Sequence, residues 1–563
     1  MSYGIMGSSG DTYMLTYLTT RRTKCIYFDG ASATVFGYGQ MDTQMLHIWG
    51  NVSGPPINSA QSLFYEEYAR AAWLCDWLSA KGLRGPGWGY EGIVRMNAGF
   101  EMIWCDFNSP SIKLISHLNV TPPLLPKLVG RKNMAGEGAT SYFPLPPSPT
   151  RTDKSNDPSN IPIPRGNGSE LERNPFMKGR IWNWFASGAD HYGSSGDGPG
   201  HGEVRVKVIS CGFLSYYSPV FFTQARARAD EEGKYLNLTK EGYWAGPGTT
   251  DWRSHSLDAL TRRRRWHALD DISPAAATTM RHDLEKVLSD SLSESPAKCS
   301  GIDWTIMSSE IIQTYAGPLK VYLATLMSSK GMTRGTGKRF EEWLTVVRDQ
   351  THSFLAPFLE YPEHVDEDTW KRGSKLFNDT YSQCRFQYTR LLGLQGDLFL
   401  GPQEILLKWA VEEVLGVICS VLVEVGLSIE GLSQSTFNPG HDEDIFNVQS
   451  LQTEVARWTQ GVEQLMAWLG WAGEWTRCEE KCAWDEKCYI PMWPLIAGEI
   501  VPDKGHNYSG YDYRHSSPHR NFPPNRTSGI PGRGWQWLKD DTTLWKPICA
   551  KVEYLVGGGK QII

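Results

Sequence analysis

The chain has 563 residues, of which 40% are hydrophobic, and it carries a formal net charge of −6 at pH 7. This length and apolar content allow several domain-sized units with sizeable cores. The mildly acidic balance provides no basic surface of the kind that binds nucleic acid, so we expect no nucleic-acid partner.

Seven Asn-x-Ser/Thr sequons, the acceptor pattern for N-linked glycans, are distributed along the chain. Chance would supply roughly two or three in a chain of this composition, so the pattern is in excess. The excess predicts passage through the secretory pathway and an extracellular or cell-surface location. The acceptors are Asn51, Asn119, Asn167, Asn237, Asn378, Asn507 and Asn525.

Eleven cysteines fit the same oxidising compartment, in which disulfides form and persist. The odd number leaves one thiol over, and we expect a free, buried cysteine. Alternatively, the odd cysteine forms a disulfide with another molecule or with a cysteine in a missing segment of the chain. Four of the cysteines fall in the tail of the chain, at Cys478, Cys482, Cys488 and Cys549.

The first 24 residues contain no apolar run of the length that a signal peptide needs. We expect a signal or membrane anchor outside the 563 residues of the chain, with unconventional export or unused sequons as alternatives. The longest apolar stretch, residues 405–427, is interrupted by Lys408, Glu412, Glu413 and Glu424. Because charges at the centre of a bilayer are costly, we expect a buried amphipathic helix there and no membrane span.

The N-terminal part alternates strand and helix signals. Residues 24–50 mix β-formers with glycines and predict two short strands joined by a turn at Asp29–Gly30. Apolar residues at helical spacing from 62 to 81, followed by Gly82, predict a helix. Residues 90–107 predict a β-hairpin with residues 97–99 as its turn.

The hairpin also has a predicted register, in which one face is apolar and the other holds an Arg95–Glu101 ion pair. The apolar face carries Val94, Met96, Phe100, Met102 and Trp104. The expected opposite pairs are Arg95 with Glu101, Val94 with Met102, Met96 with Phe100, and Ile93 with Ile103.

The rest of the chain contains a predicted insert, a strand, a series of helices and an irregular tail. Residues 121–178 are rich in Pro, Ser and Asn and predict a disordered, glycosylated insert. Residues 202–217 alternate valines with basic residues and predict a half-exposed strand. Helical runs are then predicted at 278–292, 304–328, 337–360, 367–395, 402–431 and 447–475, before an irregular, disulfide-bonded tail.

These signals predict an α+β protein with a β-rich N-terminal half, a multi-helix second half and a disulfide-bonded irregular tail. The expected domains are residues 1–120 (β-rich with one helix), 121–178 (insert), 179–270 (β-rich continuation), 271–475 (helical) and 476–563 (Cys-rich tail).

Four sequence blocks resemble a family of uncharacterised fungal secreted or membrane-anchored proteins. They are YFDGAS (27–32), GYEGIVRMNAGFEMIWCDF (89–107), GEVRVKV (202–208) and CEEKCAWDEKCYIPMWPL (478–495). The resemblance implies a fungal source, export, and a membrane anchor or signal outside this sequence. It assigns no catalytic residue, since the family has no established activity.

Three carboxylates, Glu91, Glu101 and Asp106, fall on the predicted hairpin. A pair of carboxyl groups several ångströms apart is what glycoside hydrolysis requires, so these are the candidate catalytic residues. The alternatives are a cross-strand ion pair of Glu101 with Arg95 and turn chemistry.

A Gly-rich segment combines histidines with carboxylates, the ligand types of zinc and related divalent ions. Its candidate metal ligands are Asp190, His191, Asp197 and His201. Their spacing matches no strict metal motif, so a flexible loop or a substrate-contacting loop are the alternatives. The identity of any cofactor stays unknown at this point.

Twenty-three tryptophans suggest a further possibility, because aromatic rings stack on sugars as well as filling cores. Trp88, Trp104, Trp182 and Trp184 are the candidates for a glycan platform, whereas tryptophans at helical spacing are expected in the core. We therefore expect a secreted or cell-surface glycoprotein that binds cell-wall glycan or a surface partner, or is structural. The alternative is a glycoside-hydrolase-like enzyme using the hairpin carboxylates.

Overall fold

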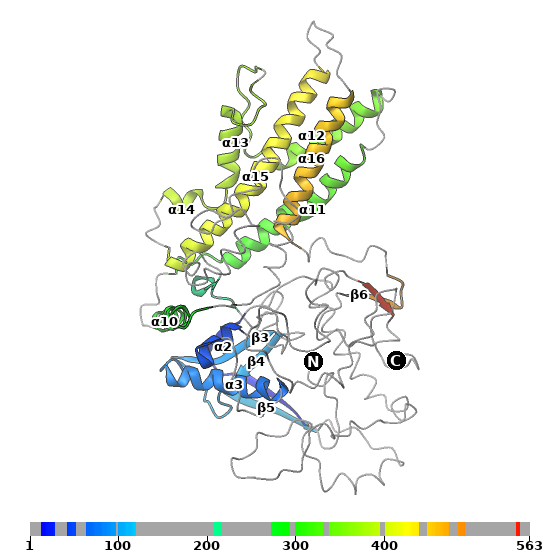
Figure 1. Ribbon diagram of the computed structural model, residues 1–563. Coiled ribbons are helices and arrows are strands. Elements are labelled where there is room, and N and C mark those ends of the chain that lie inside the picture. The colour runs from blue at the N-terminus through cyan, green and yellow to red at the C-terminus, as the bar shows by residue number, and fades with distance from the viewer. Residues whose placement is uncertain are drawn as a thin grey trace. The chain divides into compact units, whose positions relative to one another are not determined.

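The chain is α+β, as predicted: strands in the N-terminal part are followed by a series of helices (Figure 1). It divides into two compact units, the first from residues 1–204, 265–292 and 476–563, the second from residues 205–264 and 293–475. The computed structural model describes residues 13–28, 42–51, 63–96, 100–119, 207–216, 269, 272–292, 299–329, 337–366, 368–394, 400–437, 448–471, 482–489 and 548–551.

A three-stranded sheet in the order β2-β3-β4 organises the first unit. β2 (Lys24–Tyr27) runs parallel to β3 (Tyr90–Met96), which forms an antiparallel hairpin with β4 (Phe100–Trp104). The predicted hairpin register is confirmed. Arg95 lies opposite Glu101, Val94 opposite Met102, Met96 opposite Phe100, and Ile93 opposite Ile103. The turn at 97–99 lies outside the described residues.

The connection between the parallel strands is helical. The predicted helix is confirmed as α3 (Leu63–Ala80), and Gly82, at φ +66°, follows its end. The second strand predicted within residues 24–50 is wrong for residues 42–49, which form helix α2 (Asp42–Trp49). The physical reason is that parallel strands need a long crossover, usually helical, whereas a tight turn joins only antiparallel strands.

The core of the first unit lies between the sheet and α3. Leu74 and Leu78 of α3 are buried together with Ile26 and Ile93 of the sheet. A disulfide joins Cys75 of α3 to Cys105 at the end of β4. Helix α10 (Pro274–Asp290) adds Leu288 to this core, and the Tyr90 hydroxyl donates to the Leu288 carbonyl at 3.2 Å.

Two antiparallel strand pairs complete the described part of this unit. β1 (Tyr13–Thr19) pairs with β5 (Ile112–Asn119), and β6 (Glu486–Tyr489) pairs with β7 (Ile548–Lys551). We did not predict β1 or β5. The tail was predicted to be irregular, but β6 and β7 form a short antiparallel ladder in it, with Cys488 opposite Cys549.

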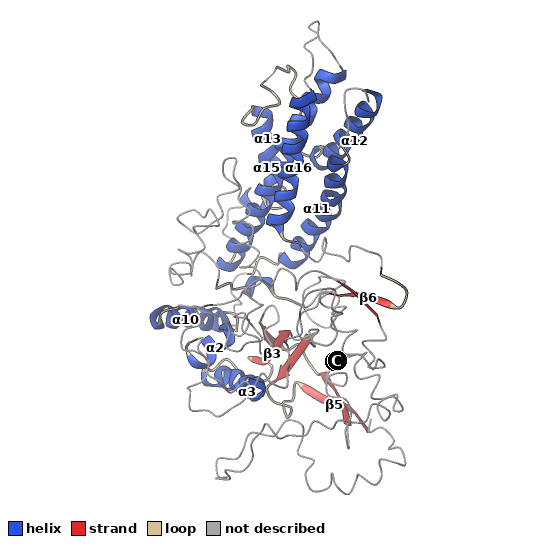
Figure 2. Ribbon diagram, turned by 45° about the vertical axis from the view of Figure 1, so that its right-hand side comes forward, coloured by secondary structure: helices blue, strands red, loops and turns tan. Residues whose placement is uncertain are grey.

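The second unit is a helical bundle in which α15 packs beside α12, α13 and α16 (Figure 2). The predicted run 367–395 is two helices, because residues 386–389 form turns between them. The helices are α11 (Trp304–Met327), α12 (Gly337–Leu355), α13 (Lys375–Arg385), α14 (Arg390–Leu394), α15 (Pro402–Phe437) and α16 (Val448–Leu469).

The strand predicted over 202–217 is wrong for its described part, residues 207–216, which contains no strand. Ser210–Gly212 instead forms the 3₁₀ helix η4. Cys211 is disulfide-bonded to Cys299, and Ser210 Oγ accepts a hydrogen bond from the Trp304 backbone nitrogen at 3.3 Å. These tertiary bonds dock the segment onto the start of α11, which overrides its strand-like alternation.

Helix α15 is the centre of the bundle and is buried on more than one side. Among the described residues it is the one helix long and apolar enough to cross a membrane, yet 61% of its most apolar window is buried. A helix that is hydrophobic around its circumference is what the core of a large bundle requires. The burial predicted for residues 405–427 is confirmed, whereas the predicted amphipathic pattern is wrong, because buried residues such as Val411 and Leu427 lie on opposite sides of the helix.

Candidate functional site

The predicted catalytic residue Glu91 is buried, with only 5% of its surface exposed. Its Oε1 accepts a hydrogen bond from the Gly87 nitrogen at 3.1 Å, and its Oε2 accepts one from Ser109 Oγ at 2.9 Å. The carboxylate therefore ties β3 to the loops before it and after β4. This is a structural role.

Glu91 and Glu101 lie at different positions of the β3–β4 ladder. The Glu91 carbonyl accepts a hydrogen bond from the Cys105 nitrogen at 3.1 Å, whereas Glu101 lies opposite Arg95. Four residues along a strand place the Cα atoms of the two acids roughly 13 Å apart. Arg95 is 1% exposed, and the Glu101 side chain is not among the described ones.

Asp106 is exposed and closes a turn after β4. Its Oδ1 accepts a hydrogen bond from the Asn108 nitrogen at 2.9 Å, and its carbonyl accepts one from the Trp104 indole nitrogen at 2.8 Å. An aspartate that bonds the backbone two residues later is typical turn chemistry.

The predicted metal ligands Asp190, His191, Asp197 and His201 lie outside the described residues. Within the described ranges, no group of three or more His, Cys, Asp and Glu side chains could hold a metal ion. A metal at the Gly-rich segment therefore stays a prediction.

Three of the predicted glycan acceptors, Asn51, Asn119 and Asn378, are described, and all three are exposed. Asn378 lies in α13 and donates to the Gly373 carbonyl at 3.2 Å, while Thr380 of the same sequon is fully buried. A glycan there would have to be attached before α13 folds. Asn167, Asn237, Asn507 and Asn525 lie outside the described residues.

One face of the sheet carries partly exposed aromatic and thioether groups, and we call Tyr27, Met102 and Trp104 the aromatic face. Successive strand residues point to opposite faces of a sheet. Ile26 and Ile93 point to the face that packs against α3, so Tyr27, Met102 and Trp104 lie on the other face. Trp104 packs over Gly92, where a Cβ would lie 3.6 Å from its ring, and its indole N–H is bonded to Asp106. The ring is therefore held in one orientation.

Trp88, in the loop before β3, is 54% exposed, and a Cβ added to Gly85 would overlap its indole. A large aromatic ring is thus presented to solvent on a close-packed glycine support. The other two candidates, Trp182 and Trp184, lie outside the described residues.

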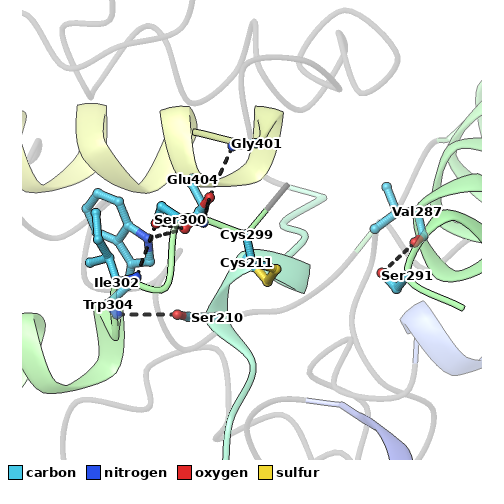
Figure 3. Close-up of a disulfide and its surroundings, with 10 residues drawn as sticks. All are labelled: Ser210, Cys211, Val287, Ser291, Cys299, Ser300, Ile302, Trp304, Gly401 and Glu404. Atoms are coloured by element: carbon cyan, nitrogen blue, oxygen red, sulfur yellow. Dashed lines mark hydrogen bonds between the residues drawn. A yellow bond between two sulfur atoms is a disulfide. The ribbon is translucent and has the colours of Figure 1, made fainter. Parts of the chain in front are cut away.

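The second unit contains a fully buried carboxylate, Glu404, that we did not predict (Figure 3). It accepts hydrogen bonds from the backbone nitrogens of Ser300 and Gly401 at 2.9 and 3.1 Å, from the Ser300 hydroxyl, and from the Trp304 indole at 3.2 Å. Burial acts to raise the pKa of Glu404, but these donors outweigh it and hold the pKa below its ordinary value.

Glu430 is a second buried carboxylate that we did not predict, near the other end of α15. Arg348 donates to both its oxygens at 2.7 and 2.6 Å, Gln434 donates at 2.9 Å, and His352 Nε2 lies 3.2 Å away. Burial opposes the charge, yet these partners lower the pKa of Glu430. The sequence shows Glu430 as an acid within a long apolar helix. An acid in such a helix can also face solvent, so the sequence did not reveal that this one is buried.

Comparison with known proteins shows homology to two yeast proteins. The family described as "YPL277C N-terminal domain" matches residues 5–125, which contain β1 to β5. "Uncharacterized protein YOR389W" of Saccharomyces cerevisiae is 25% identical over 504 residues, covering 88% of this chain and 66% of that protein. "Uncharacterized protein YPL277C" of the same organism is 36% identical over 118 residues, covering 20% of this chain and 22% of that protein.

The predicted resemblance to an uncharacterised fungal family is thereby confirmed. The alignments span just under two thirds of the one relative and about a fifth of the other. No solved structure matches the chain.

Proposed function

We propose that the protein is a secreted or cell-surface glycoprotein that binds cell-wall glycan through Trp88 and the aromatic face. The observation that carries the first half is the set of disulfides, which includes the Cys384–Cys419 bridge between α13 and α15. Both of its cysteines are buried, at 1% and 0% exposure, so the bridge belongs to the core of the bundle. Bridges of this kind form and persist in oxidising compartments.

The sequons support the same compartment. Asn51, Asn119 and Asn378 are exposed in the folded protein, so a bulky glycan on each would meet solvent. A buried acceptor asparagine would have argued against glycosylation at that sequon.

The aromatic face supports glycan binding. Sugar rings present C–H groups that pack on aromatic rings, with polar groups at the rim to bond the hydroxyls. Trp104 is held by its bond to Asp106, and Asp106 and Asn108 are exposed beside it. A rigid ring loses little conformational freedom on binding.

Binding is better supported than hydrolysis. Glu91 is buried and hydrogen-bonded to Gly87 and Ser109, Asp106 closes its own turn, and the backbone positions of Glu91 and Glu101 are four residues apart along the ladder. A glycoside-hydrolase activity would need a carboxyl pair in which both groups reach one glycosidic bond.

Whether the chain is glycosylated and disulfide-bonded in the secretory pathway is tested by expressing it behind a yeast secretion signal and digesting the product with an N-glycosidase. We expect a mass loss on digestion, glycopeptides at Asn51 and Asn119, and disulfides intact in non-reducing peptide maps. A homogeneous unglycosylated protein with free Cys384 and Cys419 would contradict the proposal.

Glycan binding is tested by co-sedimentation with insoluble chitin and β-1,3-glucan. We expect Trp88→Ala and Trp104→Ala to lose most of the bound fraction, because each stacked ring contributes on the order of 1 kcal/mol. The control is Trp409→Ala, which removes an exposed ring from α15 in the other unit. Unchanged binding in both variants, or soluble sugar released over long incubation, would contradict a binding role for this surface.

A further inference from the structure

The helical unit contains a groove of about 350 Å³ that none of the predicted sites uses. One wall comes from the end of α13 and the turn after it, with Ser382, Phe386 and Thr389. The other comes from α15, with Lys408 and Glu412. This volume lies at the lower end of the range for small-molecule sites, about 300–1,000 Å³.

The groove holds more positive than negative charge. Its charged lining residues are Arg390, Lys408 and Glu412. The Thr389 hydroxyl donates to Glu412 Oε1 at 2.7 Å, and the Lys408 ammonium lies 3.9 Å from the same oxygen. Glu412 is thus compensated within the wall, and the groove as a whole carries one unit of positive charge.

The charges are also partly withdrawn from water. The side chains of Lys408 and Glu412 are each 12% exposed, and Thr389 is 1% exposed. A charge in such a setting interacts with a ligand more strongly than a solvated surface charge does, since less water screens it. Arg390, at the mouth, is exposed.

The remaining lining is suited to a hydroxylated ring. Phe386 supplies an apolar wall, and the Arg385 guanidinium lies 5.1 Å from its ring centroid, which holds the ring in place. Ser382 supplies a hydroxyl, and Glu412 accepts hydrogen bonds. Apolar walls with a few convergent polar groups are typical of small-molecule sites.

We propose that this groove binds a small hydroxylated monoanion of the size of a sugar acid. Arg390 and Lys408 contact the ligand's carboxylate, while Ser382 and Glu412 bond its hydroxyls and Phe386 packs against the ring. The site does not rest on the function proposed for the aromatic face, because all its residues lie in the helical unit.

The proposal is tested by isothermal titration calorimetry of the full chain with glucuronate, glucose and inorganic phosphate. We expect glucuronate to bind and glucose to bind at least roughly tenfold more weakly, since a charge-assisted hydrogen bond is lost. Phosphate, which lacks the ring, should also bind more weakly. Absence of binding by glucuronate overturns the proposal, and equal affinity for phosphate reduces the groove to a non-selective anion site and overturns it too.

Variants locate the binding. We expect Lys408→Met and Arg390→Gln each to weaken glucuronate binding roughly tenfold. Lys320→Gln, which removes an exposed cation from α11 of the same unit, should leave the affinity unchanged. Thermal unfolding checks that each variant is folded. If Lys408→Met does not fold, the glucuronate affinity of Arg390→Gln is the test, because Arg390 is exposed. Unchanged affinity in Arg390→Gln overturns the proposal.

Discussion

The Trp304 indole nitrogen donates a hydrogen bond to the Glu404 carboxylate at 3.2 Å and so joins the first residue of α11 to the first turn of α15. The same carboxylate accepts two hydrogen bonds from Ser300, the residue after the disulfide-bonded Cys299. One buried charge thus organises the start of two helices and the segment before α11, which is disulfide-bonded to η4 (Figure 3).

Replacing Glu404 by Gln should destabilise the helical unit by roughly 2–3 kcal/mol, because a charged acceptor is lost and an amide N–H₂ faces existing donors. The measurement is urea unfolding followed by circular dichroism. The control is Glu454→Gln, an exposed acid on α16 whose ion pair with Arg457 lies on the surface, for which about 0–1 kcal/mol is expected. Equal effects of the two substitutions would contradict the role given to Glu404.

The helical unit should lose stability in acid. The pKa values of Glu404 and Glu430 are lowered in the folded protein, so each contributes stability above its unfolded value of about 4.3. That stability is lost as pH falls through the folded pKa values. Hydrogen exchange of α11 and α15 between pH 7 and pH 3 measures it. Constant protection down to pH 3 would contradict the prediction.

As the pH is lowered, the first unit should begin to lose stability at a higher pH than the helical unit does. Burial, with Arg281 nearby, lowers the pKa of His47 to about 3, whereas an unfolded histidine titrates at about 6.5. The unfolded chain therefore binds an extra proton between these values, and stability falls by about 1.4 kcal/mol per pH unit as pH decreases. Exchange of α2 and α3 reports this loss, and His47→Leu, if folded, should remove the pH slope.

Two glycines of the bundle should respond in opposite ways to alanine. A Cβ at Gly426 of α15 would lie 2.6 Å from Thr351 Cγ2 and closer still to Leu355 Cδ1, so Gly426→Ala should cost roughly 1–3 kcal/mol. A Cβ at Gly461 of α16 would meet only Val421 Cγ1, at 3.8 Å. Gly461→Ala should therefore stabilise by about 0.5–1 kcal/mol. Melting temperatures of the two variants check the signs.

Cys25 is free within the described residues, as one cysteine was expected to be, although it is only half-buried. Burial raises the pKa of its thiol to about 11, so only about one molecule in a thousand is the reactive thiolate at pH 8. Iodoacetamide should modify it slowly before unfolding and rapidly afterwards. We expect one thiol per denatured chain, since the other ten of the eleven cysteines can form five pairs. Two or more thiols would contradict this.

Local patterns predicted the elements whose side chains interact along or directly across the chain. The hairpin register followed from alternation in residues 90–107, and helices such as α11 and α12 followed from apolar spacing. Residues 42–49 and 207–216 went wrong because tertiary bonds override weak local preferences: a parallel strand pair demanded a helical crossover, and the Cys211–Cys299 bridge docked η4 onto α11.

The candidate site shows the same division. That Glu91, Glu101 and Asp106 lie on one hairpin was readable from the sequence, but their separation and hydrogen-bond partners were not. Ser109 and Gly87, which engage Glu91, belong to loops on either side of the hairpin. Glu404 and Glu430 could not be distinguished from solvent-exposed helix acids, since their donors come from other segments of the chain.

By itself, the sequence determined the α+β class and the pairing of β3 with β4, and its sequons and cysteines predict an oxidising compartment. These depend on composition, or on neighbours a few residues apart. Only the tertiary structure decided which acids are buried, which cysteines pair, and that Ser382 and Lys408 line one groove. Such relationships join residues far apart in the chain, and no local periodicity records which distant side chain will satisfy a buried charge.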